Sequence, residues 1–131
     1  MTNAKIKRMT TQQKQVFAAK CFSKYCEEKG ITHKFIDELI EHLISIENFE
    51  NIVDWERKGG QLQLTGRGDE LPKSLNSIVS LKDRSTFIEL IDTVVEVGIV
   101  DMYGEETEKP RLFLVKCIDI LKKNKVSIPK F

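Results

Sequence analysis

Histidine and cysteine are the side chains of this sequence that could bind a metal ion or act as nucleophiles, and their spacing favours neither role. His33 and His42 are nine residues apart, whereas a helical zinc site needs two histidines four residues apart with a glutamate beside the first. Cys21 and Cys26 lack the Cys-x-x-Cys spacing of a redox pair. We therefore expect no metal site, no cofactor and no enzymatic activity.

A glycine-rich segment, Gly66-Arg-Gly68, begins like a phosphate-binding loop. The third glycine of such a loop is absent, no buried strand precedes the segment, and Asp69 and Glu70 would repel a phosphate. Arg67-Gly68-Asp69 also matches an adhesive tripeptide, a match that is common by chance. We interpret the segment as a turn.

The distribution of charge along the chain is more informative than its net value of +1. Residues 35–56 (the first acidic segment) and residues 89–108 (the second acidic segment) contain no lysine or arginine, and each carries a net charge of −7. Residues 1–34 and 109–131 carry +6 each. The carboxylates that could form a partner-binding surface are Asp37, Glu38, Glu41, Glu47, Glu50, Asp54, Glu89, Asp92, Glu96, Asp101, Glu105 and Glu106.

Two interpretations of these segments remain open. The acidic helix faces are either solvated or paired with the basic first and last helices of the same molecule, as charge runs usually are. Alternatively, the two segments form one negative surface that steers a basic protein partner. Trp55 and Tyr103 lie within these segments and would anchor such an interface if exposed. Ile52 and Val53 beside Trp55 favour the core for the tryptophan.

Apolar periodicity predicts helices along the chain. Thr10 and Gln13 form a capping box that opens a helix over residues 11–29, and Gly30 closes it. Thr32 is expected to cap a second helix with a broad apolar stripe, beside which His42 should be partly buried and hydrogen-bonded.

Weaker signals predict the remaining helices. A short helix is expected around residues 49–58, another after Pro72, a fifth after Asp83 or Ser85, and a last one from Pro110. Residues 94–100 are rich in β-branched side chains, which are typical of a strand. The helical spacing of the apolar residues that lead into this stretch favours helix over strand.

The length of 131 residues and a hydrophobic content of 40% indicate one domain with its own core. We expect an all-α bundle of five to six helices over residues 10–131, with a loop around residues 59–71. Lys5, Lys7 and Arg8 precede any periodic segment, so residues 1–9 are expected to form a mobile basic arm.

The sequence also suggests a compartment. It contains no apolar run that resembles a signal peptide or a membrane span. Three cysteines, an odd number within apolar helical patterns, suit buried thiols in a reducing environment. We expect a soluble cytoplasmic protein without membrane contact.

The segments Phe17-Ala-Ala-Lys-Cys-Phe22 and Phe35-Ile-Asp-Glu-Leu-Ile-Glu-His42 belong to a small all-α chain with acidic helix faces. In this overall character the chain resembles the immunity proteins of bacterial contact-dependent growth inhibition and related polymorphic toxin systems. The resemblance implies a cognate toxin domain as partner, often a basic nuclease, whose active site is blocked. Our hypothesis is therefore an immunity or inhibitor protein.

The alternative hypothesis is a small nucleic-acid-binding or regulatory module that uses the basic ends of the chain. Its candidate residues are Lys5, Lys7, Arg8, Lys14, Lys122, Lys123 and Lys125. The last three also suit the C-terminal end of a helix dipole, which is the more ordinary explanation for them.

Overall fold

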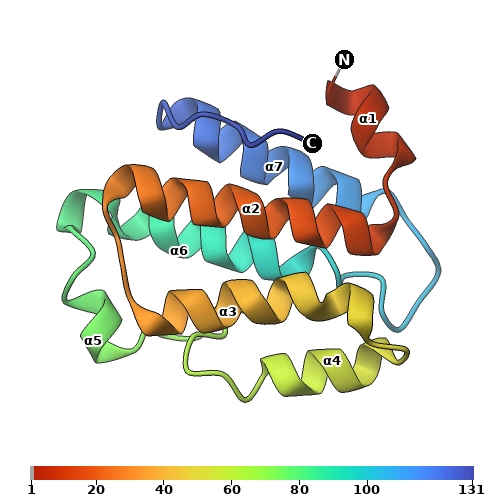
Figure 1. Cartoon of the computed structure of the whole chain (residues 1–131), viewed down its shortest axis with the longest axis horizontal. Helices are drawn as coiled ribbons and strands as arrows, with labels where there is room; N and C mark the ends of the chain where they lie inside the picture. The colour runs from red at the N-terminus through yellow and green to blue at the C-terminus, as the bar shows by residue number, and fades with distance from the viewer. Residues whose placement is uncertain (1) are drawn as a thin grey trace.

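The computed structural model describes residues 2–131, and this part of the chain consists of helices joined by turns and loops, without a β-strand (Figure 1). The all-α class predicted from periodicity is confirmed. In chain order the elements are α1 (Thr2–Arg8), α2 (Thr11–Lys29), α3 (Lys34–Ile44), the 3₁₀ helix η1 (Ser45–Asn48), α4 (Ile52–Gly59), α5 (Lys73–Asn76), α6 (Leu81–Glu96) and α7 (Lys109–Lys123).

Helix α2 is the central element of the bundle, in contact with α3, α6 and α7 (Figure 1). Its predicted start is confirmed, because the Thr10 hydroxyl accepts a hydrogen bond from the Gln13 amide while the Gln13 side chain accepts one from the Thr10 amide. Gly30 ends the helix at a φ of 68°, a left-handed conformation that glycine adopts without strain. Buried side chains along α2, among them Phe22 and Tyr25, fix its position in the core.

Two of the predicted helix starts are wrong by a few residues. Helix α3 is capped by His33 rather than Thr32, since the His33 Nδ1 atom accepts a hydrogen bond from the Phe35 amide. Helix α6 begins after Ser80, whose hydroxyl accepts from the Asp83 amide, and not after Asp83. Several neighbouring side chains can cap a helix, and the tertiary position of the first turn selects among them.

The predicted helix over residues 94–100 is confirmed in its first part. Helix α6 continues to Glu96, and turns follow from Val97 to Tyr103 without any strand in this stretch. The β-branched residues Val94, Val95 and Val97 are buried on the core side of this segment. The apolar period therefore outweighed the strand preference of the individual side chains.

The segment that was expected to form a mobile arm is helical. Thr2–Arg8 forms helix α1, and the side chain of Ile6 is fully buried in the core; Met1 lies outside the described residues. A single apolar residue produces no periodic signal, so the sequence could not indicate that this segment packs against the bundle.

The predicted loop around residues 59–71 is present and packs on α6. Gly66 has a φ of 68°, and a Cβ atom there would lie 2.8 Å from the Ile91 Cγ2 atom, so only glycine allows this close approach. Leu64 is buried beside it. The turn predicted for Gly66-Arg-Gly68 therefore serves to cover the core.

The three cysteines, Cys21, Cys26 and Cys117, are buried and unpaired by disulfides, as expected. Among residues 2–131, no helix combines the length and the apolar character needed to cross a membrane.

Candidate functional site

Helix α3 displays the carboxylates of the first acidic segment on its outer side. Ile36, Leu39 and Leu43 are buried against the bundle. The helical period then directs Asp37, Glu38 and Glu41 outward, and all three are exposed, as the sequence predicts. Three further acids of this segment are also exposed: Glu47 in η1, Glu50 in the turn that follows η1, and Asp54 in α4.

The second acidic segment divides into two parts with different surroundings. On α6, Glu89 is exposed, whereas Asp92 and Glu96 are half-buried. One oxygen of Asp92 accepts a hydrogen bond of 3.2 Å from the Gly68 amide, so this carboxylate holds the loop of residues 59–71 on the helix.

The remaining carboxylates of the second acidic segment lie in the connection between α6 and α7. Asp101 accepts hydrogen bonds of 2.7 Å from both the amide and the hydroxyl of Thr107, which shapes the turn. Glu105 and Glu106 are exposed, and Tyr103 is 80% exposed. This connection therefore presents an aromatic ring among free carboxylates.

The two acidic segments meet at a groove of about 280 Å³ between the η1–α4 region and the α6–α7 connection. Glu50 from the first segment lines this acidic groove together with Asp101 and Glu106 from the second. Its apolar lining consists of Ile46, Phe49, Ile52 and Met102. The structure thus brings together carboxylates that are more than 50 residues apart in the chain.

A buried glutamine fixes one wall of the acidic groove. Gln15 of α2 is fully buried, donates a hydrogen bond of 2.9 Å to the Val94 carbonyl and accepts one of 2.8 Å from the Gly98 amide. A Cβ atom on Gly98 would lie 2.9 Å from the Gln15 Oε1 atom, so the contact requires glycine. These bonds anchor the start of the α6–α7 connection to the central helix.

A second acidic hollow, the α2–α3 slot, has a volume of about 410 Å³. Asp37 and Glu41 flank it, and Ile40 and Ile44 supply its apolar wall, opposite Ser23 of α2. Ile44 is 42% exposed there. Two carboxylates beside apolar surface match the head and the methylene stem of a lysine or arginine side chain.

The free carboxylates of the first acidic segment are not neutralised by ion pairs among residues 2–131. In the part of the chain that the structure describes, the ion pairs of this segment are Asp54 with Arg57 and Glu56 with Arg67. Neither of the two arginines belongs to the basic segments, residues 1–34 and 109–131. The interpretation in which this segment pairs with the first and last helices therefore fails.

Trp55 does not belong to the surface, contrary to its inclusion among the candidate binding residues. It is 1% exposed, its indole N–H donates a hydrogen bond of 2.9 Å to the His42 carbonyl, and its ring stacks on the His42 ring. The apolar neighbours of Trp55 in the sequence favoured this outcome. Tyr103 is therefore the aromatic side chain left to the proposed surface.

His42 is buried as predicted, but its Nε2 atom has no hydrogen-bond partner. Burial, with further contributions from the charges of Arg67 and Lys58, lowers the pKa of His42 to about 4. The ring is thus neutral at neutral pH and packs as an aromatic group against Trp55.

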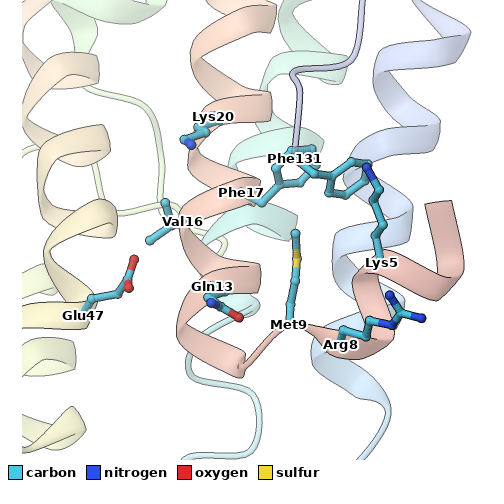
Figure 2. A pocket seen from close by; sticks show the side chains of 9 residues that line it. All are labelled: Lys5, Arg8, Met9, Gln13, Val16, Phe17, Lys20, Glu47 and Phe131. Atoms are coloured by element: carbon cyan, nitrogen blue, oxygen red, sulfur yellow. The ribbon is translucent and has the colours of Figure 1, made fainter.

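The structure also contains a larger groove that sequence reasoning missed, the basic groove, with a volume of about 470 Å³ (Figure 2). Lys5, Arg8 and Lys20 provide its positive charge, and Gln13 and Glu47 also line it. Its apolar lining is Met9, Val16, Phe17 and Phe131. In the sequence, the basic residues of α1 were the only sign of this groove. Its other lining residues come from α2, η1 and the C-terminal segment, which come together only in the folded chain.

The described residues contain neither a candidate metal cluster nor a cysteine whose pKa is lowered. No group of three or more histidine, cysteine, aspartate or glutamate side chains among residues 2–131 is arranged to hold a metal ion. Burial raises the pKa of the Cys21 and Cys26 thiols to about 12, so both are protonated at neutral pH.

Comparison with known proteins gives no relative for this chain: no protein-family model matches it, and neither a curated protein nor a solved structure is significantly similar.

Proposed function

We propose that this chain is an immunity-type inhibitor that binds a basic protein toxin, with a nuclease as the expected class, and blocks its active site. The observation that carries the proposal is the acidic groove, where Glu50 and Glu106, from acidic segments far apart in the sequence, line one hollow without an ion-pair partner among the described residues. A nuclease needs a positive surface to engage the phosphate backbone, and an acidic protein surface competes for it.

The binding mode follows from the lining of the two hollows. A lysine or arginine of the partner would place its methylenes on Ile40 and Ile44 in the α2–α3 slot and its charged head between Asp37 and Glu41. Tyr103 would pack against an apolar part of the partner beside the acidic groove. Free carboxylates around both hollows would accelerate association by electrostatic steering.

The alternative of a nucleic-acid-binding module receives less support from the arrangement of the basic residues. Lys7 lies near the start of α7, since its charge, after the hydrogen bond and charge of Arg111 and the charge of Lys14, contributes to the lowered pKa of Glu108. Lys122 and Lys123 lie at the other end of this helix of 15 residues, about 22 Å away at 1.5 Å per residue. A nucleic acid would therefore have to span the length of α7 to contact both clusters. Retention of generic DNA or RNA on a filter at low salt would favour the alternative.

The test of the proposed function is protection of cells against a toxin. The C-terminal domain of a large secreted protein encoded immediately upstream of this chain is expressed in bacteria with and without the chain. We expect the wild-type chain to restore growth. The triple variant Glu50→Lys, Glu105→Lys, Glu106→Lys should fail to do so, because it reverses exposed carboxylates at and beside the acidic groove.

A matched control separates a specific surface from net charge. Glu27→Lys, Glu70→Lys, Asp119→Lys changes the charge by the same amount at exposed positions outside both acidic segments, and this variant should protect as well as the wild type. Equal protection by both triple variants would overturn the proposed surface. Failure of the wild-type chain to protect, when both proteins are produced and folded, would overturn the immunity function.

A further inference from the structure

The basic groove combines elements from both ends of the chain. Lys5 and Arg8 belong to α1, Phe17 and Lys20 to α2, and Phe131 to the C-terminal segment that returns along α7 (Figures 1 and 2). Its volume of about 470 Å³ exceeds that of the acidic groove and falls within the range of roughly 300–1,000 Å³ typical of small-molecule sites.

The floor of the basic groove is apolar and ordered by packing. The Phe17 and Phe131 rings stack with their centroids 4.4 Å apart and an interplanar angle of 7°. Met9 and Val16 are half-buried and supply further apolar lining; Met9 lies next to this stack, and Val16 lies on the side of α2 that faces Glu47 (Figure 2). Phe131 is still 44% exposed. An apolar ligand body could cover this surface and remove it from water.

The charges around the groove are distributed unevenly. Lys5 and Arg8 lie on one side, and neither forms an ion pair within residues 2–131 (Figure 2). Glu47 lies on the opposite side, toward which Lys20 of α2 also projects. A ligand with a single anionic head would therefore orient its head toward Lys5 and Arg8 and its apolar body toward Met9 and Val16.

The aromatic rings are not available as a stacking platform for bases. One face of Phe131 is covered by Phe17, and the Lys5 ammonium lies 5.6 Å from the centroid of the same ring. Single-stranded nucleic acids bind through free ring faces in a basic channel, so they suit this groove less well than an unbranched apolar chain.

We propose that the basic groove binds a small anionic amphiphile, a carboxylate with an unbranched aliphatic chain of medium length. Lys5 and Arg8 bind the carboxylate by charge-assisted hydrogen bonds, and the aliphatic chain lies on Met9 and extends toward Val16. This site is separate from the acidic groove and does not depend on the proposed inhibitor function.

The test is isothermal titration of the full chain with sodium octanoate and sodium decanoate below their micelle concentrations. We expect saturable binding with one molecule per chain. Each added methylene should tighten the dissociation constant by up to about 4-fold, which corresponds to about 0.8 kcal/mol per buried CH₂, until the groove is filled. Decanol, which lacks the charge, should bind at least about 10-fold more weakly than decanoate, as expected for the loss of a charged hydrogen bond.

Variants assign the binding to the groove. Lys5→Ala, Arg8→Ala should weaken decanoate binding by about 10-fold or more. Lys122→Ala, Lys123→Ala, which removes the same charge from the end of α7, should leave it unchanged. Val16→Phe keeps the cations but narrows the groove, so it should reduce the preference for decanoate over octanoate.

Four results would overturn the proposal. The first is the absence of saturable decanoate binding to the folded wild-type chain. The second is equal affinity for decanol and decanoate, and the third is equal loss of binding in the Lys122→Ala, Lys123→Ala control. Displacement of decanoate by millimolar inorganic phosphate would also overturn it, because the site would then select an anion without its aliphatic chain.

Discussion

The two acidic segments carry the same net charge of −7, yet the fold uses their carboxylates differently. In the first acidic segment, Asp37, Glu38 and Glu41 project from α3 without hydrogen-bond or ion-pair partners among the described residues. In the second, Asp92 and Asp101 accept backbone hydrogen bonds. A carboxylate that holds a loop is not free to bind a partner, so equal charge in the sequence does not mean equal binding capacity.

The strongest expected effect concerns the rate of partner binding through the first segment. Asp37→Lys, Glu38→Lys, Glu41→Lys should slow association with the basic partner by roughly 10–1,000-fold at low salt, because the electrostatic steering is lost. Stopped-flow measurements across a salt series, with the partner recovered in the protection assay, would show this. The salt dependence of the rate should decrease in the variant.

The control for this prediction is the triple variant with lysine at positions 27, 70 and 119, which has the same net charge. Its association rate should stay close to that of the wild type. Association rates that do not change across the salt series in any of the proteins would contradict the electrostatic role of the first segment.

The next largest effect is the loss of stability expected when Gln15, which anchors the second acidic segment to α2, is replaced. Gln15→Ala leaves the buried Gly98 amide without a partner, at a cost of about 1–3 kcal/mol, and leaves the Val94 carbonyl with its 3.4 Å hydrogen bond from the Val97 amide. The free energy of unfolding in urea should fall by about 1–3 kcal/mol. Gln12→Ala, at an exposed position of the same helix, should change it by less than about 0.5 kcal/mol. Similar values for the two variants would show that the anchor is unimportant.

His42 distinguishes the buried side of the first segment from its exposed side. Its pKa is lowered from 6.5 to about 4, so the unfolded chain binds a proton on this ring between these pH values and the folded chain does not. Stability is therefore complete above pH 6.5 and is lost as the pH falls toward 4, by at most about 3 kcal/mol.

The measurement for His42 compares urea unfolding of the wild type and His42→Phe at pH 7, 5.5 and 4. Phenylalanine keeps an aromatic ring against Trp55 and does not titrate. The difference between the two proteins should grow as the pH falls, whereas the titration of carboxylates affects both alike. A difference that is constant with pH would contradict the lowered pKa.

The helices with local signals could be predicted from the sequence, and the others could not. The bounds of α2 follow from Thr10, Gln13 and Gly30, which act within one turn of the helix ends. Helix α1 depends on the burial of Ile6 in the tertiary core, which no local pattern indicates. The cap of α3 is His33 rather than Thr32 because the tertiary position of the first turn, which no local pattern indicates, also decides between neighbouring capping residues.

The exposed acids of α3 could also be predicted, because the helical period places them opposite Leu39 and Leu43. The position of Glu50 across the acidic groove from the α6–α7 connection could not be predicted, since it depends on how α2 positions both regions. The acidic neighbours of Trp55 make it a candidate for the surface, whereas Ile52 and Val53 favour the core, where the buried carbonyl of His42 gives its indole a partner. The basic groove could not be predicted either, because its lining residues come from opposite ends of the chain.

The smallest effect tests whether Asp92 serves the fold or the surface. Asp92→Ala removes the acceptor for the Gly68 amide and should lower the free energy of unfolding by about 0.5–1.5 kcal/mol, with little effect on partner association. Glu89→Ala, three residues earlier and exposed, should change stability by less than about 0.5 kcal/mol. If both variants keep full stability and Asp92→Ala slows association, the carboxylate of Asp92 belongs with the free acids of α3, and the contrast between the two segments disappears.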